Sequence, residues 1–373
     1  MRLSTVVFGL GWLAAATVSL AGEPAWTTSD TCGSCHRDIY RVWRNSMHAR
    51  AMEEPFFLDS YRETEALRGR QLASVCLECH APMAAVLGDS ALERKISWEG
   101  VTCDYCHGVK SVTETKSGPK AQVEIGRVKR GPIHEAESTG HDVAYSELHT
   151  QSLFCAPCHE YTNADGVPIL TTYTEWKGSR AAERGETCQV CHMALTKADV
   201  VDPKVARSSQ ARVNLHEMPG AHTIRQLLTA LKIDLDASQH GDQLRLELTV
   251  RNRGAGHAVP TGMPGRRIVL RVELSAGGRT FVDSRVYGKQ FANAAGGVVT
   301  HVADYFVGGL ELQSDTRIRV DETRVESFDF PVAGNERATV EISLAYEHNP
   351  RGENAERERF VFYSDRRFLR PRI

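Results

Sequence analysis

Apolar and polar residues alternate in the second half of the chain, from about residue 224 onward. Alternation with a period of two residues is typical of strands that bury one face. The clearest runs cover residues 244–251, 268–274, 325–330 and 338–346. Glycine-rich turn signals separate them, at Gly277-Gly278, Gly296-Gly297, Gly308-Gly309 and Gly334-Asn335. We therefore expect a C-terminal all-β, sandwich-like domain over residues 224–373.

The first residues carry the only long apolar stretch of the sequence, residues 6–21. It follows Arg2, ends in Ser19-Leu20-Ala21 and leads into polar residues, which is the pattern of a secretory signal peptide. The stretch is shorter than the roughly 20 residues that a membrane span needs, which makes an uncleaved membrane helix the weaker alternative. The sequence predicts a signal peptide over residues 1–21 and export from the cytoplasm.

Length and charge narrow the class of protein further. A chain of 373 residues that is 41% hydrophobic is longer than one core usually supports, so we expect a second domain over residues 22–223. Lys and Arg number 45 against 47 Asp and Glu, and the net charge is −2. With no long basic run either, the sequence excludes a nucleic-acid partner on electrostatic grounds.

All ten cysteines belong to five Cys-x-x-Cys pairs, and a histidine follows each pair directly. Zinc ribbons and thioredoxin-like enzymes also use such pairs, but neither requires that histidine. In covalent haem attachment, two thiols bond to the porphyrin and the adjacent imidazole ligates the iron. The sequence predicts five haem c groups instead of disulfides. The attachment residues are Cys32, Cys35, Cys76, Cys79, Cys103, Cys106, Cys155, Cys158, Cys188 and Cys191, and the proximal ligands are His36, His80, His107, His159 and His192.

Five porphyrins within residues 32–192 leave about 32 residues for each, too few to insulate them from one another. We therefore expect the haems to pack edge to edge and to form most of the domain's interior. The surrounding chain should fold as short helices and irregular segments. Residues 22–223 are thus predicted to be a mostly α-helical and irregular multihaem cytochrome c domain.

Ten histidines lie outside the motifs and are candidates for the sixth iron ligands. His36 and His48 would be about 18 Å apart along a helix, so we expect His48 to serve a haem attached elsewhere. The same reasoning applies to His149 and His159. Methionine ligation is a less favoured alternative. The expected distal ligands are His48, His141, His149, His216 and His222, with His134 a weaker candidate and His240, His301 and His348 expected on the surface.

Two short patterns add detail to these expectations. Trp43-x-x-Ser46-x-His48 recurs as Trp176-x-x-Ser179-x-Ala181, with alanine in place of the histidine. We expect the tryptophans to pack beside porphyrins and the serines to cap helices. In the β-domain, a glycine-rich loop over residues 254–262 contains His257. This loop either presents the histidine to a haem across the domain interface or is a tight turn with a local hydrogen bond.

The order of motifs resembles a known family. Cys32 to Ala49, Gly100 to His107 and the run from Glu175 to Met193 resemble multihaem c-type cytochromes related to the tetrahaem electron acceptor of hydroxylamine oxidoreductase. The resemblance covers about residues 30–222 and omits the β-domain, and this chain has five motifs instead of four. It implies that His48 ligates the third haem and that His141 returns to the first. It also implies that an iron with an open position can occur.

Taken together, these features favour an exported pentahaem cytochrome that relays electrons between redox partner proteins. Haem propionates would add negative charge. They would favour docking on basic surfaces of partner proteins, through transient contacts that salt weakens. The main alternative is an enzyme in which one open iron reduces or oxidises a small nitrogen or sulfur oxyanion. A self-associating subunit of a cytochrome filament is a further alternative. We expect a periplasmic or cell-surface location, with no membrane span after cleavage.

Overall fold

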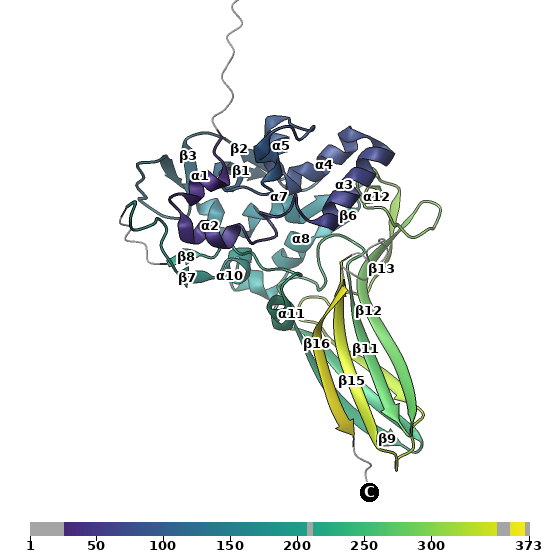
Figure 1. The fold of residues 1–373 in the computed structure, drawn as a ribbon. Helices are drawn as coiled ribbons and strands as arrows, with labels where there is room; N and C mark the ends of the chain where they lie inside the picture. The colour runs from purple at the N-terminus through teal and green to yellow at the C-terminus, as the bar shows by residue number, and fades with distance from the viewer. Residues whose placement is uncertain (1–25, 207–211, 349–358, 370–373) are drawn as a thin grey trace, which may run out of the picture.

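The computed structural model describes residues 26–206, 212–348 and 359–369, which form two regions of different construction (Figure 1). Short helices and small sheets make up the N-terminal region, and long strands make up the C-terminal one. The expected signal peptide lies outside the described residues. Within the described part, every helix is too short or too polar to cross a bilayer.

The N-terminal region consists mainly of short helices, as the crowding of the five motifs predicts. Most helices here have four to seven residues, and α3 and α4 are the longest. The α-helices are α1 (Ser29–Gly33), α2 (Arg37–Trp43), α3 (Pro55–Arg68), α4 (Arg70–His80), α5 (Pro82–Leu87), α6 (Cys103–Gly108), α7 (Ala156–His159), α8 (Thr172–Lys177), α9 (Arg180–Glu183) and α10 (Cys188–His192). The 3₁₀ helices are η1 (Lys95–Trp98), η2 (Glu147–Thr150) and η3 (Ser152–Phe154).

Four two-stranded sheets connect these helices, and the sequence did not predict them. Their strands have three to five residues, too few to show a period of two. The pairs are β1 (Val109–Thr113) with β2 (Lys120–Val123), β3 (Val128–Gly131) with β4 (Asp142–Tyr145), β5 (Glu160–Thr162) with β6 (Pro168–Thr171), and β7 (Leu195–Lys197) with β8 (Arg212–Asn214).

The C-terminal region contains a three-stranded and a five-stranded antiparallel sheet, preceded by α11 (Ile224–Ala230). The first has the order β14-β10-β9, and the second the order β13-β12-β11-β15-β16. The bounds are β9 (Leu231–His240), β10 (Gln243–Asn252), β11 (Arg267–Ala276), β12 (Arg279–Asn293), β13 (Leu310–Asp315), β14 (Thr323–Phe330), β15 (Ala338–Glu347) and β16 (Arg359–Leu369), with α12 (Asp304–Val307) before β13. The four predicted runs fall in β10, β11, β14 and β15.

One hydrophobic cluster fills the space between the two large sheets. Leu246 on β10 and Ile268 on β11 come from different sheets, yet both are fully buried in this cluster. Leu246 lies opposite Phe328 in the register of the three-stranded sheet. Every second residue of β10 and β11 is buried, which accounts for the alternating sequence pattern. This packing of two sheets on a common core agrees with the sandwich expected from the sequence.

Polar contacts hold the two regions together. Arg68 at the end of α3 pairs with Asp304 of α12 at 2.9 Å, and α12 lies beside α3 in Figure 1. Nearby, the ring nitrogen Nδ1 of His301 lies 2.8 Å from Glu63. On β12, the buried Lys289 donates to the backbone carbonyl of Pro168 in the N-terminal region at 2.8 Å. The β-rich region is therefore attached along the side of the helical region by several side chains.

Candidate haem sites

Each Cys-x-x-Cys-His motif lies at or within a short helical turn. The third and fifth motifs lie in α6 and α10, and the second motif ends α4. Residues three and four apart face the same side of a helix, so two thiols and an imidazole from one motif can reach one porphyrin. All ten cysteines are described, and none of them is in a disulfide. The cysteines are thus available for haem attachment, as the sequence predicts.

Cysteines from different motifs lie close to one another. Three pairs of thiols from different motifs lie close enough for each thiol to shift the pKa of the other: Cys32 with Cys103, Cys79 with Cys158, and Cys155 with Cys188. These contacts join the first motif to the third, the second to the fourth, and the fourth to the fifth. The motifs therefore lie next to one another in the helical region instead of occupying separate pockets.

Histidine rings form pairs at a spacing that suits a shared metal ion. Bonds of about 2.0–2.1 Å from two imidazoles to one ion place the ring centroids about 6 Å apart. The observed centroid distances are 6.1 Å for His36 and His141, 6.2 Å for His48 and His159, 6.4 Å for His107 and His216, and 6.2 Å for His192 and His257. Four motif histidines thus face a second histidine at the distance that two axial ligands of one iron require.

Backbone carbonyls orient six of these rings. The Nδ1 atom donates to a carbonyl oxygen, which leaves Nε2 free for a metal ion and fixes the tautomer. For the motif histidines the contacts are His36 to Val200, His107 to Arg130 and His192 to Pro219, each at 2.6 Å. For their partners they are His216 to Asn214 at 2.7 Å, His141 to Asp142 at 3.0 Å and His257 to Ala258 at 3.0 Å. The donor set and its surroundings fit axial haem ligation.

His149 also lies near the third motif, but its hydrogen bonds differ. Its ring centroid is 5.7 Å from that of His107. However, Nε2 contacts the backbone carbonyl of Cys106 at 3.1 Å, and Nδ1 contacts the hydroxyl of Ser146. Both nitrogens are engaged, whereas Nε2 of His216 has no such contact among the described bonds. His216 is therefore the better placed partner for His107.

Burial keeps most of these imidazoles neutral. Desolvation lowers the pKa of His48 and His216 to about 4, and that of His159 to about 3. A low pKa favours the neutral ring, which is the form that binds a metal ion. In addition, Nδ1 of His48 is buried and has no hydrogen-bond partner in the described structure.

The second motif is built differently from the other four. The ring of His80 stacks on Phe57, with centroids 3.9 Å apart, and among the described ring contacts it has no histidine partner. Burial lowers the pKa of His80 to about 4, so this ring too is held neutral. His80 is therefore placed to serve as the proximal ligand of a second haem, and within the described residues no histidine ring is paired with it.

One expectation about an individual histidine needs correction, and another stays a prediction. His222, expected as a distal ligand, stacks on His348 with centroids 4.1 Å apart, so these two rings do not enclose a metal ion between them, and ligation of another iron by His222 stays a prediction. His348, expected on the surface, is partly buried, with Nε2 enclosed and its pKa lowered to about 3 by burial. The sequence does not reveal this stacking, because the two residues are 126 positions apart. The exposed His240 and His301 agree with expectation, and the weaker candidate His134 is exposed and stacks on Tyr145.

The internal repeat is also present in the structure. The indole of Trp43 donates to the carbonyl of Val101 at 3.0 Å, and that of Trp176 donates to Glu186 at 2.8 Å. Both acceptors lie two residues before a motif cysteine. In the second copy Ser179 caps α9, as expected. Each tryptophan therefore ties its repeat to the segment just before an attachment motif, the third motif for Trp43 and the fifth for Trp176.

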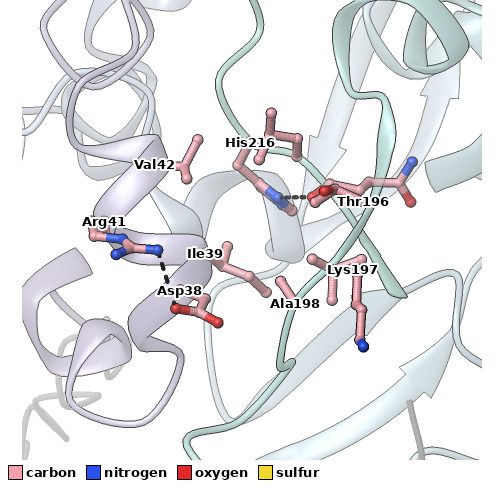
Figure 2. Close-up of a pocket in the computed structure, with 11 residues that line it drawn as sticks. Asp38, Ile39, Arg41, Val42, Thr196, Lys197, Ala198 and His216 are labelled. Carbon is pink, nitrogen blue, oxygen red and sulfur yellow. Dashed lines mark hydrogen bonds and ion pairs between the residues drawn. The ribbon is translucent and has the colours of Figure 1, made fainter. Parts of the chain in front are cut away.

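A cavity of about 190 Å³ lies beside the ring of His216 (Figure 2). Ile39 and Val42 of α2 form one wall, and Lys197 and Ala198, at and just after the end of β7, lie on the other side. The space is lined by both apolar and charged side chains, which suits a group with an apolar body and a polar edge. Because the ring of His216 lies beside that of His107, the cavity is next to the third motif.

Comparisons with known proteins agree with this geometry. Residues 31–108, which contain the first three motifs, match the family described as "Cytochrome c554 and c-prime". Cytochrome c-554 of Nitrosomonas europaea is 26% identical over 172 residues, which cover 44% of this chain and 66% of that relative. The chain is a multihaem c-type cytochrome.

A solved structure extends the similarity of the cytochrome to its C-terminal region. The penta-haem cytochrome c552 of Thermochromatium tepidum superposes with a TM-score of 0.71 at 21% identity. The match covers 92% of this chain and 99% of the other, so the two share their overall fold. The match to cytochrome c-554 of Nitrosomonas europaea is shorter than this structural match, and it spans slightly less than two thirds of that protein.

The histidine pairs of the cytochrome correct and extend the sequence-based assignments. The resemblance placed His141 with the first haem, and its ring lies beside His36. It placed His48 with the third haem, whereas the ring of His48 lies beside His159 of the fourth motif. His257 was left open between two interpretations, and its ring faces His192 of the fifth motif. The alanine at position 181 was the available signal that the second repeat needs a histidine from elsewhere.

Proposed function

We propose that this cytochrome relays electrons between redox partner proteins outside the cytoplasm, through five covalently attached haem c groups. The observation that carries the proposal is the convergence of the attachment motifs: four motif histidines each face a second histidine at 6.1–6.4 Å, and thiols of different motifs lie close enough to shift one another's pKa. Haem c supplies a reversible one-electron change at iron when it is bound. Closely packed haems would allow electrons to pass from one iron to the next.

The chain's own residues would hold each group in a defined way. In each motif the two cysteines attach the porphyrin and the following histidine is the proximal ligand. We assign His141, His216 and His48 as sixth ligands of the first, third and fourth haems, on the basis of ring spacing. His80 would hold the second haem without a histidine on the other side, so we expect that iron to be high-spin.

The proximity of these thiols also suggests the order of the relay. They connect the first haem with the third, and the fourth with both the second and the fifth. Cys106 of the third motif lies close enough to Cys155 and Cys158 of the fourth to influence their ionisation. We infer a branched arrangement in which the fourth haem is the branch point, next to the second, third and fifth haems.

The charge of the protein favours basic redox partners. The net charge of the sequence is −2, and the haem propionates would add to it. Docking between opposite charges is fast and weakens as salt screens it. We therefore expect transient complexes with basic electron carriers instead of one permanent partner.

A reductive titration combined with a mixing experiment tests this function. The purified protein should accept about five electrons per chain. When reduced, it should then reduce a basic monohaem cytochrome at a rate that falls as salt is added. A capacity well below five electrons would contradict the proposed relay. Re-oxidation only by nitrite or hydroxylamine, with no transfer to the protein acceptor, would favour the enzymatic alternative.

A further inference from the structure

A loop of the C-terminal region reaches into the haem-binding region. It connects β10 to β11 and contains Gly254, Gly256 and His257. The ring of His257 lies 6.2 Å from that of His192 in the fifth motif, with the two planes tilted by 20°. Its Nδ1 donates to the carbonyl of Ala258, which leaves Nε2 without a described partner. The loop therefore presents a histidine in the orientation of a metal ligand.

The second repeat is shaped to receive this loop. In the first repeat, the carbonyl of His48 accepts a hydrogen bond from the amide of Val101. In the second, Ala181 occupies the same position and accepts from Glu186, also at 2.9 Å. A Cβ atom on Gly256 would lie only 3.2 Å from the Cβ of Ala181. Small residues on both sides thus let the loop of the C-terminal region approach the place where the first repeat carries its histidine.

We propose that His257 is the sixth ligand of the fifth haem, and that Glu175 is the residue that positions it. The inference rests on the proposed attachment of a haem at Cys188 and Cys191. It makes the β-rich region part of the redox centre as well as a docking surface. The ligand missing from the second repeat is supplied by a distant part of the chain.

Glu175 lies where the loop, α8 and β13 meet. One carboxylate oxygen accepts from the amide of Ala258 at 3.0 Å, directly after the ligand. The other accepts from the hydroxyl of Thr171 at 2.7 Å and pairs with Arg317 at 2.8 Å. Glu175 belongs to α8, so it ties the loop to the same region that carries the fifth motif.

The ion pair of Glu175 is largely shielded from solvent. The side chain of Arg317 is 8% exposed, and it also pairs with Asp315 at the end of β13 at 2.7 Å. An ion pair in such surroundings is hard to break on one side, because the remaining charge stays desolvated. The Arg317 side chain therefore joins the anchor of the loop to the five-stranded sheet.

Spectroscopy of the His257→Ala holoprotein tests the ligand assignment. We expect five attached haems, as in wild type, with about one fewer low-spin ferric haem and about one more high-spin haem by electron paramagnetic resonance. Added imidazole should restore the low-spin signal. His301→Ala, which removes an exposed histidine at the same junction, should leave the spectrum unchanged. An unchanged low-spin count in His257→Ala with five haems present would overturn the assignment and leave the proposed relay intact.

A second variant covers the case in which His257→Ala does not accumulate. His257→Met offers a thioether ligand, and methionine ligation raises the potential of a c-type haem. We expect one of five haems to titrate at a clearly higher potential while the others keep theirs. Five unchanged potentials would contradict the proposal. A wild-type protein with fewer than five haems would instead contradict the proposed function itself.

The role of Glu175 is tested by comparing three variants. Glu175→Ala should produce a partial high-spin population and shift the potential of one haem. Glu175→Gln should produce a smaller change, because its amide oxygen can still accept from Ala258. Glu63→Ala breaks the contact with His301 at the other side of the junction and should leave both readouts unchanged. If Glu175→Ala matches wild type in spin state and potentials, Glu175 does not position the ligand.

Discussion

The two regions of this cytochrome differ in what fills their interiors. In the described C-terminal region, 24 buried hydrophobic residues form one cluster between the sheets. In the haem-binding region, the cluster that packs around Leu77 and Phe57 contains 7. Cysteines and histidines, instead of aliphatic side chains, meet at its centre. The comparison indicates that the C-terminal region is stabilised by its own apolar core and the N-terminal region by its cofactors.

The largest expected effect comes from removing a haem. Cys103→Ala combined with Cys106→Ala should remove one of five haems and open the helical region to proteolysis, while the sandwich stays protected. Mass spectrometry and limited proteolysis measure the two effects. Val190→Ala is the control, because this exposed residue lies between the cysteines of the fifth motif without being one. Equal protease resistance in both variants would show that the haem does not hold this region together.

A substitution in the core of the sandwich should destabilise the C-terminal region and leave the haem-binding region unchanged. Leu246→Ala removes a fully buried side chain and should lower the free energy of unfolding by about 2–5 kcal/mol. Urea unfolding followed by circular dichroism measures this loss. Val325→Ala, at a residue 55% exposed on β14, should change it by less than about 0.5 kcal/mol. The axial-ligand spectra of the first and third haems should stay the same in both variants, and a change there would mean that the cores are not separate.

Acid should lower the folding stability of the protein through protonation of His348. In the folded protein, burial lowers its pKa to about 3 from an ordinary value of 6.5. The unfolded chain therefore binds one more proton between these values, and stability falls as the pH decreases through that window. One such group contributes at most about 1.4 kcal/mol per pH unit. His348→Phe should reduce the slope of stability against pH below about 6.5, whereas the same change at the exposed His240 should not.

The smallest expected effect concerns the hydrogen bonds of the repeat. Trp176→Phe removes the donor to Glu186 and should cost about 1 kcal/mol of stability. Trp43→Phe removes the corresponding bond to Val101 and should cost a similar amount. The indole of Trp98 also donates, to Leu92, but this residue is 45% exposed and water can replace the bond. A larger loss from Trp98→Phe in thermal unfolding would contradict this reasoning.

The difference between the two interiors also explains which strands of the sandwich could be predicted from the sequence. Strands β10 and β15 bury nearly every second residue against a protein core, so their alternation is visible in the sequence. The first half of β12 is largely exposed on both faces, and its residues show no alternating pattern. Apolar periodicity reports burial, so it identifies strands only where one face is covered.

In the haem-binding region, local chemistry was predictable and distant pairing was not. The attachment motifs follow from residues within five positions of one another. The pairing of His48 with His159 spans 111 residues and depends on how the helices pack around the haems. The same holds for His257, which comes from a different region of the fold. Motif spacing fixes the proximal side of each site, and only the tertiary structure brings in the other side.

The mass of the exported protein under denaturing conditions tests the central claim most directly. Covalent bonds survive denaturation, whereas ligands held only by coordination are lost. We predict the mass of the processed chain plus five haem groups. The mass of the bare chain, or of a chain with fewer haems in a fully matured preparation, would contradict the account.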